Sequence, residues 1–82
     1  PELHKKLVKL LKKNKSEYNT VIKKVKEIVN SEDVEHYKNL RYNMKDSKRV
    51  HIGHSVLVFS HDKNNNLISF EDYDHHDKIY KR

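Results

Sequence analysis

The spacing of hydrophobic residues changes once along this chain, between residues 30 and 48, and that change limits the fold more than any other feature. Before it, apolar side chains recur at intervals of three and four, which is typical of amphipathic helices. After it, apolar and polar side chains alternate, which is typical of strands with one buried face. A chain of 82 residues has room for one domain. We therefore expect a single α+β domain in which helices cover a sheet.

Two helices are predicted in the first part of the chain. The first starts at Pro1 and Glu2, because proline and acidic residues favour the first helical turn, and it stops at Asn14. The second has Ser16 as its N-cap and ends near residues 30–31. Their apolar stripes consist of Leu3, Leu7, Leu10 and Leu11 in the first helix and of Tyr18, Val21, Ile22, Val25, Ile28 and Val29 in the second. The short connection predicts an antiparallel helical hairpin.

Three strands are predicted in the second part of the chain. Residues 48–52 alternate between polar and apolar, residues 55–60 are a nearly continuous apolar run, and residues 67–73 form the third strand. Between helices and strands, a short helical turn is predicted around Val34–Leu40. The turns between strands fall at Gly53–His54 and at Asp62–Asn66. Strands joined in this way form an antiparallel meander, and the helical hairpin should pack on one of its faces.

Alternation in the first strand separates its side chains onto two faces. Val50 and Ile52 should face the helices, which leaves Arg49 and His51 on the opposite, solvent-open face. Arginine can donate two hydrogen bonds to a phosphate. Histidine titrates near neutral pH and can act as a general acid or base. The pair is therefore compatible with phosphate chemistry, although a surface histidine without any role is the more common explanation for His51 taken alone.

The segment from residue 72 to residue 80 is rich in His, Asp and Tyr, and three interpretations of it remain open. In the first interpretation, the segment belongs to a nuclease site, with a histidine for proton transfer and a tyrosine that stacks on a base. Alternatively, it holds zinc or manganese through His75, His76 and nearby aspartates. In the third interpretation it is a polar terminus that packs Ile79 and Tyr80 on the core. Composition alone favours the third.

Positive charge is concentrated in the first 60 residues, which hold 14 Lys and Arg against 7 Asp and Glu, whereas the rest of the chain holds 4 against 5. The net charge of +6 predicts a polyanionic partner, either nucleic acid or an acidic protein segment. Lysines that only solvate helix faces are the alternative. The absence of cysteine excludes disulfides and thiolate metal sites. No apolar run could span a bilayer and no signal peptide is visible, so we expect a cytoplasmic protein without a membrane partner.

Several stretches, in their order and spacing, resemble the RelE/ParE superfamily of toxins from prokaryotic toxin–antitoxin systems, and within it the RelE and YafQ mRNA interferases. The stretches are His36–Arg41, Lys48–Gly53, Val56–Phe59 and Tyr73–Tyr80. The resemblance covers nearly the whole chain and implies a single RelE-like toxin domain over residues 1–82. The implied fold is α+β, with an N-terminal antiparallel helical hairpin packed on a three-stranded antiparallel meander sheet, or a four-stranded one if a first strand precedes the helices.

The resemblance also implies an activity. Such toxins are endoribonucleases that cut mRNA at the ribosome by metal-independent attack of the 2′-hydroxyl, which inhibits translation, and no cofactor is implied. By position, His76 is expected to be the main general acid or base and His51 its partner. Arg49 is expected to hold the scissile phosphate and Tyr80 to pack against the base. The residues expected to contact the RNA are Lys48, Arg41, His61 and Lys78. The implied partners are mRNA, the ribosome and a cognate antitoxin.

Departures from the family pattern leave alternatives open. Many RelE-like toxins have an arginine at the end of the central strand, where this chain has Ser60, with His61 or Lys48 as the candidate substitute. The acidic residues at 71–77 suit an RNA site poorly. A missing first strand would leave a sheet edge that attracts an antitoxin segment or a second copy of the chain, giving a homodimer. The alternatives are an inactive module that binds antitoxin or RNA only, and a ParE-like inhibitor of DNA gyrase.

Overall fold

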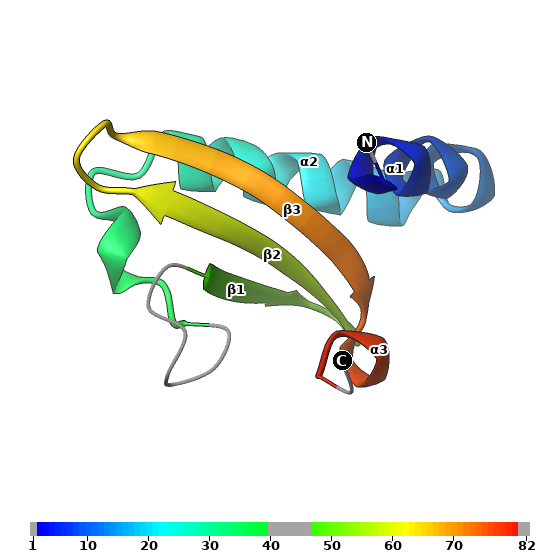
Figure 1. Cartoon of the computed structure of the whole chain (residues 1–82). Coiled ribbons are helices and arrows are strands. Elements are labelled where there is room, and N and C mark those ends of the chain that lie inside the picture. The colour runs from blue at the N-terminus through cyan, green and yellow to red at the C-terminus, as the bar shows by residue number, and fades with distance from the viewer. Residues whose placement is uncertain (1, 40–46, 81–82) are drawn as a thin grey trace.

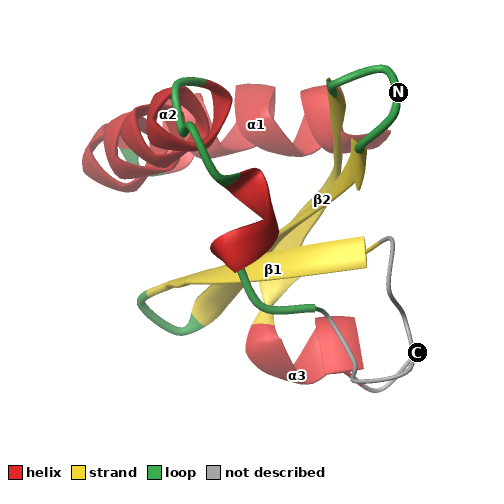
Figure 2. Cartoon of the chain, turned by 90° about the vertical axis from the view of Figure 1, so that its left-hand side faces the viewer, coloured by secondary structure: helices red, strands yellow, loops and turns green. Residues whose placement is uncertain are grey.

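The computed structural model describes residues 2–39 and 47–80, and it confirms the predicted α+β arrangement. The elements in chain order are α1 (Glu2–Lys13), α2 (Lys15–Val29), a short 3₁₀ turn η1 (Val34–His36), β1 (Ser47–Ile52), β2 (Ser55–Asp62), β3 (Leu67–His75) and α3 (His76–Tyr80). The long helices lie on one side of the sheet, and α3 lies at the end of β3 (Figure 1). Viewed from the side, the sheet separates α1 and α2 from α3 (Figure 2).

Helices α1 and α2 form the predicted antiparallel hairpin, with Asn14 as the single residue between them. Asn14 is also the N-cap of α2, because its side-chain Oδ1 accepts a hydrogen bond from the backbone N–H of Glu17 at 3.1 Å. The prediction of Ser16 as the N-cap was therefore wrong, and Ser16 lies inside the first turn of α2. Asparagine caps helices as well as serine does, and here it stands three residues before the N–H that it satisfies.

The sheet has the predicted meander order β1-β2-β3 with antiparallel neighbours. Gly53 has a φ of 61° in the turn between β1 and β2, a conformation that a residue without a Cβ adopts at little cost. The pairing between β2 and β3 shifts by one residue, since Val58 pairs with Asp72 and Phe59 with Phe70. Such a bulge bends the strand locally.

The core is divided by the sheet into two clusters. The larger one lies under α1 and α2 and consists of the buried residues Val21, Ile28, Val34, Ile52, Leu57, Phe59 and Tyr73. Val50 packs against it together with Ile52, which confirms the face predicted for these two residues. The smaller cluster consists of Val56, Val58 and Ile79, with Tyr80 packed on it. From the sequence, the face opposite α1 and α2 was expected to be open to solvent. The structure differs, because α3 covers part of this face.

The two edges of the sheet differ. At β1, the backbone N–H of Arg49 donates to the carbonyl of Lys38 at 2.9 Å, and Asn39 forms an isolated antiparallel bridge with Lys48. Part of this edge is thus covered by the segment that follows η1. Along the outer edge of β3, no further strand pairs within the described part of the chain. None of the helices built from these residues has the length and hydropathy that a bilayer crossing requires.

Candidate active site

Two histidines that are 25 positions apart in the sequence meet on the sheet face opposite α1 and α2. His51 belongs to β1 and His76 begins α3, and their rings stack with centroids 5.7 Å apart at an interplanar angle of 27°. The start of α3 is fixed because the backbone N–H of His76 donates to the carbonyl of His54 at 2.8 Å. Its other end is fixed by Ile79, which is buried against Val56 and Val58. Backbone bonding and apolar packing together therefore place His76 beside His51.

Arg49 and Tyr80 extend this pair into a row. The rings of His76 and Tyr80 lie 4.6 Å apart, one helical turn along α3. Nη1 of Arg49 lies 3.2 Å from Nδ1 of His51, and Nε of Arg49 donates to the carbonyl of Asn39 at 3.2 Å. We call Arg49, His51, His76 and Tyr80 the histidine row. The structure brings all four predicted catalytic residues together, and their catalytic roles stay a prediction.

The environment of His51 favours its neutral form. Partial burial lowers the pKa of His51 below its ordinary value, and the charge of Arg49, the neighbouring His76 and the charge of Lys38 lower it further. A guanidinium group has donors and no acceptor, so Nδ1 of His51 accepts the bond from Arg49 and the ring proton lies on Nε2. A neutral imidazole at pH 7 can act as a general base.

A shallow depression lies beside the histidine row and was not anticipated from the sequence. Its volume is about 320 Å³, and it is lined by His36, Tyr37, Lys38, Arg49, Val50 and His51. Lys38 adds a second cation to the site, near enough to affect the pKa of His51. Lys38 and Asn39 belong to His36–Arg41, one of the stretches that carry the family resemblance. This resemblance was the one sequence feature that pointed to them as site residues. Sequence periodicity could not place them, because they follow η1 and are not part of a predicted strand.

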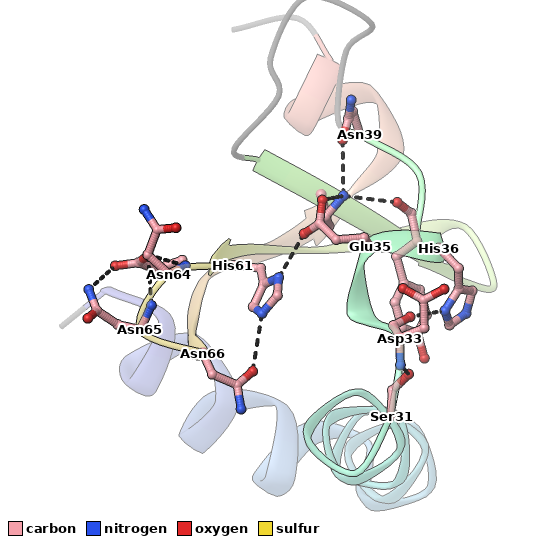
Figure 3. A network of polar contacts seen from close by, with 12 residues as sticks. Ser31, Asp33, Glu35, His36, Asn39, His61, Asn64, Asn65 and Asn66 are labelled. Carbon is pink, nitrogen blue, oxygen red and sulfur yellow. Dashed lines mark hydrogen bonds and ion pairs between the residues drawn. The ribbon is translucent and has the colours of Figure 1, made fainter.

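Lys48 and His61, two of the residues predicted to contact RNA, lie on the face of the sheet opposite the histidine row. Both are on the helix side of the sheet, and their side chains are 4% and 7% exposed. Nζ of Lys48 donates to the carbonyl of Tyr37 and to Oδ1 of Asn39, each at 3.3 Å, and lies 3.6 Å from Oε1 of Glu35. Nδ1 of His61 is 2.7 Å from Oε2 of the same glutamate. Figure 3 shows these contacts. Both side chains are thus engaged with Glu35, and the RNA contacts predicted for them stay predictions.

The other predicted residues are placed as follows. Lys78 is exposed on α3 and lines a second hollow of about 440 Å³ together with lysines of α1. His75 is exposed, and its ring stacks on His54 with centroids 6.4 Å apart rather than on His51. Arg41 lies outside the described residues. The roles predicted for Lys78 and Arg41 therefore stay predictions.

Most of the acidic side chains between residues 71 and 77 contact a lysine or a histidine side chain. Nζ of Lys6 lies 2.7 Å from Oδ1 of Asp72 and 3.0 Å from Oδ2 of Asp74, so one ammonium group of α1 bridges two carboxylates of β3. Oδ1 of Asp77 lies 3.5 Å from Nδ1 of His76 and can orient that ring. The described residues contain no group of three or more His, Cys, Asp or Glu side chains that could hold a metal ion.

Sequence comparison with known proteins identifies the family of this chain. A protein of Methanocaldococcus jannaschii named "Putative toxin RelE4" is 49% identical over 83 aligned positions, which cover all of this chain and 86% of the relative. An uncharacterized protein of Methanosarcina mazei is 50% identical over 80 positions, or 96% of this chain and 91% of the relative. No family model and no solved structure matches. The chain belongs to the RelE toxin family.

Proposed function

We propose that this chain is the toxin of a toxin–antitoxin pair and that it inhibits translation by cutting mRNA at the ribosome. The observation that carries the proposal is the histidine row, in which two imidazoles, a guanidinium and a tyrosine are neighbours at one face of the sheet. The net charge of +6 supports a polyanionic substrate. Membership of the RelE toxin family supports the toxin role and a protein antitoxin as its partner.

The proposed reaction is a transesterification within the RNA. The 2′-oxygen forms a bond to the neighbouring phosphorus while the bond from phosphorus to the 5′-oxygen breaks. His51 takes the proton of the 2′-hydroxyl, a role that its lowered pKa supports. His76 gives a proton to the leaving 5′-oxygen, and Asp77 orients its ring. The products are a 2′,3′-cyclic phosphate and a 5′-hydroxyl.

Arg49 and Tyr80 hold the substrate in this scheme. A non-bridging phosphate oxygen takes the place of Nδ1 of His51 as the acceptor from Nη1 of Arg49, since charged donors prefer an anion. This exchange leaves Nδ1 of His51 available for the 2′-hydroxyl proton. Tyr80 lies beside His76 and offers a ring on which an unpaired base stacks.

Inducible expression tests the proposal in cells. Wild type and His75→Ala, the matched control, are expected to stop growth and to leave mRNA cuts that primer extension maps. His76→Ala should reduce cleavage about 10²- to 10⁴-fold, because a general acid contributes that much. Co-expression of the cognate antitoxin should restore growth. Equal cleavage by wild type and His76→Ala would remove His76 from the mechanism, and uncut mRNA with wild type would remove the nuclease function.

A second candidate function is a non-catalytic module that binds antitoxin or RNA. The observation that favours it concerns the arginine expected at the position of Ser60, because its two candidate substitutes, Lys48 and His61, both contact Glu35 on the other face. Loss of such a charged donor would cost about 2–4 kcal/mol of transition-state stabilisation. Antitoxin binding with intact mRNA in a translating extract would support this module over the nuclease.

A further inference from the structure

Lys48 is the one buried charged side chain in the part of the chain that the structure describes. Burying an ammonium group is costly unless its donors are satisfied. Here Nζ bonds to the carbonyl of Tyr37 and to Oδ1 of Asn39, with the Glu35 carboxylate 3.6 Å away. All three acceptors belong to residues 35–39. Lys48 therefore fixes this segment against β1 and has little capacity to bind a further anion.

The same segment holds Arg49 from the other side of the strand. Consecutive strand residues point to opposite faces, so Lys48 and Arg49 reach the segment from different sides. Asn39 contacts both, with its side chain accepting from Lys48 and its carbonyl accepting from Nε of Arg49 at 3.2 Å. The backbone N–H of Arg49 also donates to the carbonyl of Lys38 at 2.9 Å. Asn39 thus links the buried lysine to the half-buried Arg49 on the opposite face.

Glu35 anchors the other end of this network. Its Oε2 lies 2.7 Å from Nδ1 of His61, and Nε2 of His61 lies 3.4 Å from Oδ1 of Asn66 (Figure 3). The hydrogen bond with His61 lowers the pKa of Glu35, and the charge of Lys48 lowers it further, so the carboxylate stays ionised at neutral pH. The network therefore runs from the β2–β3 turn through η1 to the edge of β1.

We propose that Lys48 is a positioning residue for Arg49: by holding Asn39 at the edge of β1, it fixes the orientation in which the guanidinium meets His51 and the scissile phosphate. The effect on RNA cleavage rests on the proposed function. The effect on the placement of Arg49 does not, and it can be measured without any substrate.

The consequence for His51 is specific, although Lys48 lies on the opposite face of the sheet. The groups that lower the pKa of His51, after partial burial, are Arg49 on its own strand, His76 on α3 and Lys38 in the segment after η1. Two of these, Arg49 and Lys38, are held through the segment that Lys48 fixes. Removing the ammonium should therefore let both cations move away and should raise the pKa of His51.

The test is an NMR titration of the His51 imidazole together with steady-state cleavage. Lys48→Met keeps the apolar stem and removes the donors, and Lys63→Met is the matched control, since Lys63 is exposed in the β2–β3 turn. In Lys48→Met the pKa of His51 should rise, because its two neighbouring cations are less well held, and kcat should fall about 10- to 100-fold, as expected for a misplaced catalytic group. KM should change less than kcat. Lys63→Met should match wild type in both.

Asn39→Ala keeps Lys48 and removes only the side-chain link, so it tests the proposal even if Lys48→Met folds poorly. It should shift the pKa of His51 in the same direction by a smaller amount. An unchanged pKa of His51 in folded samples of both variants, with only a lower melting temperature, would show that Lys48 is merely structural. A raised pKa in a protein whose wild type cuts no RNA would uphold the positioning role and overturn the proposed function.

Discussion

Four influences lower the pKa of His51: partial burial, the charge of Arg49, the neighbouring His76 and the charge of Lys38. All four influences disfavour the imidazolium, so the folded protein keeps this ring neutral to lower pH than an ordinary histidine. Strand alternation was enough to place Arg49 and His51 on the same face. Their direct contact could not be predicted, because it depends on the side-chain rotamer of Arg49, which the carbonyl of Asn39 holds.

Replacing Arg49 tests this description of the site. Arg49→Gln should raise the pKa of His51, because one nearby positive charge is lost, and should reduce kcat/KM about 10²- to 10³-fold, because the phosphate loses a charged donor. The acid limb of the pH profile of kcat/KM should move to higher pH together with the NMR titration of His51. Arg49→Lys is the control, since it keeps the charge but not the planar fork. An acid limb at the same pH in wild type and Arg49→Gln would contradict the assignment of His51 as the base.

Among the elements, α3 has the most effect on the site and was the least predictable. A helix of five residues is not stable by itself, and its sequence has too few residues to show a helical period. The sequence left three interpretations of residues 72–80 open, and the structure shows the packing that the third of them expected. Ile79 packs into the smaller cluster, as expected of a packed terminus, and this packing carries His76 to His51.

Truncating Ile79 should therefore affect the site more than the fold. Ile79 is 5% exposed, and Ile79→Ala is expected to lower the free energy of unfolding by about 2 kcal/mol, the low end for buried Ile→Ala, because α3 can detach locally. The contact between the His51 and His76 rings should weaken in NOE spectra, and cleavage should fall with it. Val29→Ala, at a position 56% exposed, should change stability by less than about 0.5 kcal/mol. Undiminished cleavage by Ile79→Ala would mean that α3 is not needed to place His76.

The contact between α1 and β3 predicts how stability changes in acid. Burial opposes ionisation of Asp74, but hydrogen bonds from Lys6 and from the His75 backbone bring its pKa below the ordinary value. A carboxyl group with a lowered folded-state pKa stabilises the protein fully above its unfolded pKa, and this contribution is lost as pH falls through the folded-state pKa.

Lys6→Met should remove that contribution. Urea denaturation between pH 5 and pH 2 should show a smaller loss of stability in the variant than in wild type, and at pH 7 the variant should be about 0.5–1 kcal/mol less stable, as for partly exposed ion pairs. Lys5→Met, on the exposed face of α1, provides the matched control. Parallel pH profiles for wild type and Lys6→Met would show that the ion pairs do not contribute.

For the whole molecule, the order of helices and strands followed from two hydrophobic periods, because each long element buries one face. What the sequence could not show were polar interactions between distant segments. Lysine is rarely buried, so the burial of Lys48 was not expected, and its partners lie about ten residues earlier in a segment without periodicity. The hydrogen bonds of Lys6 to Asp72 and Asp74 join residues more than 60 positions apart, and local sequence patterns could not predict them either.

The histidine row is proposed to cut RNA with two imidazoles, and the ends of the cut RNA test this mechanism. The most direct measurement is the chemistry of the ends left on mRNA in a translating extract to which the purified protein is added. Wild type and His75→Ala should leave 2′,3′-cyclic phosphate and 5′-hydroxyl ends, while His51→Ala and His76→Ala should each lower their yield at least about 10²-fold. Intact mRNA with wild type, ends that carry a 5′-phosphate, or undiminished cleavage by the double variant His51→Ala and His76→Ala would contradict it.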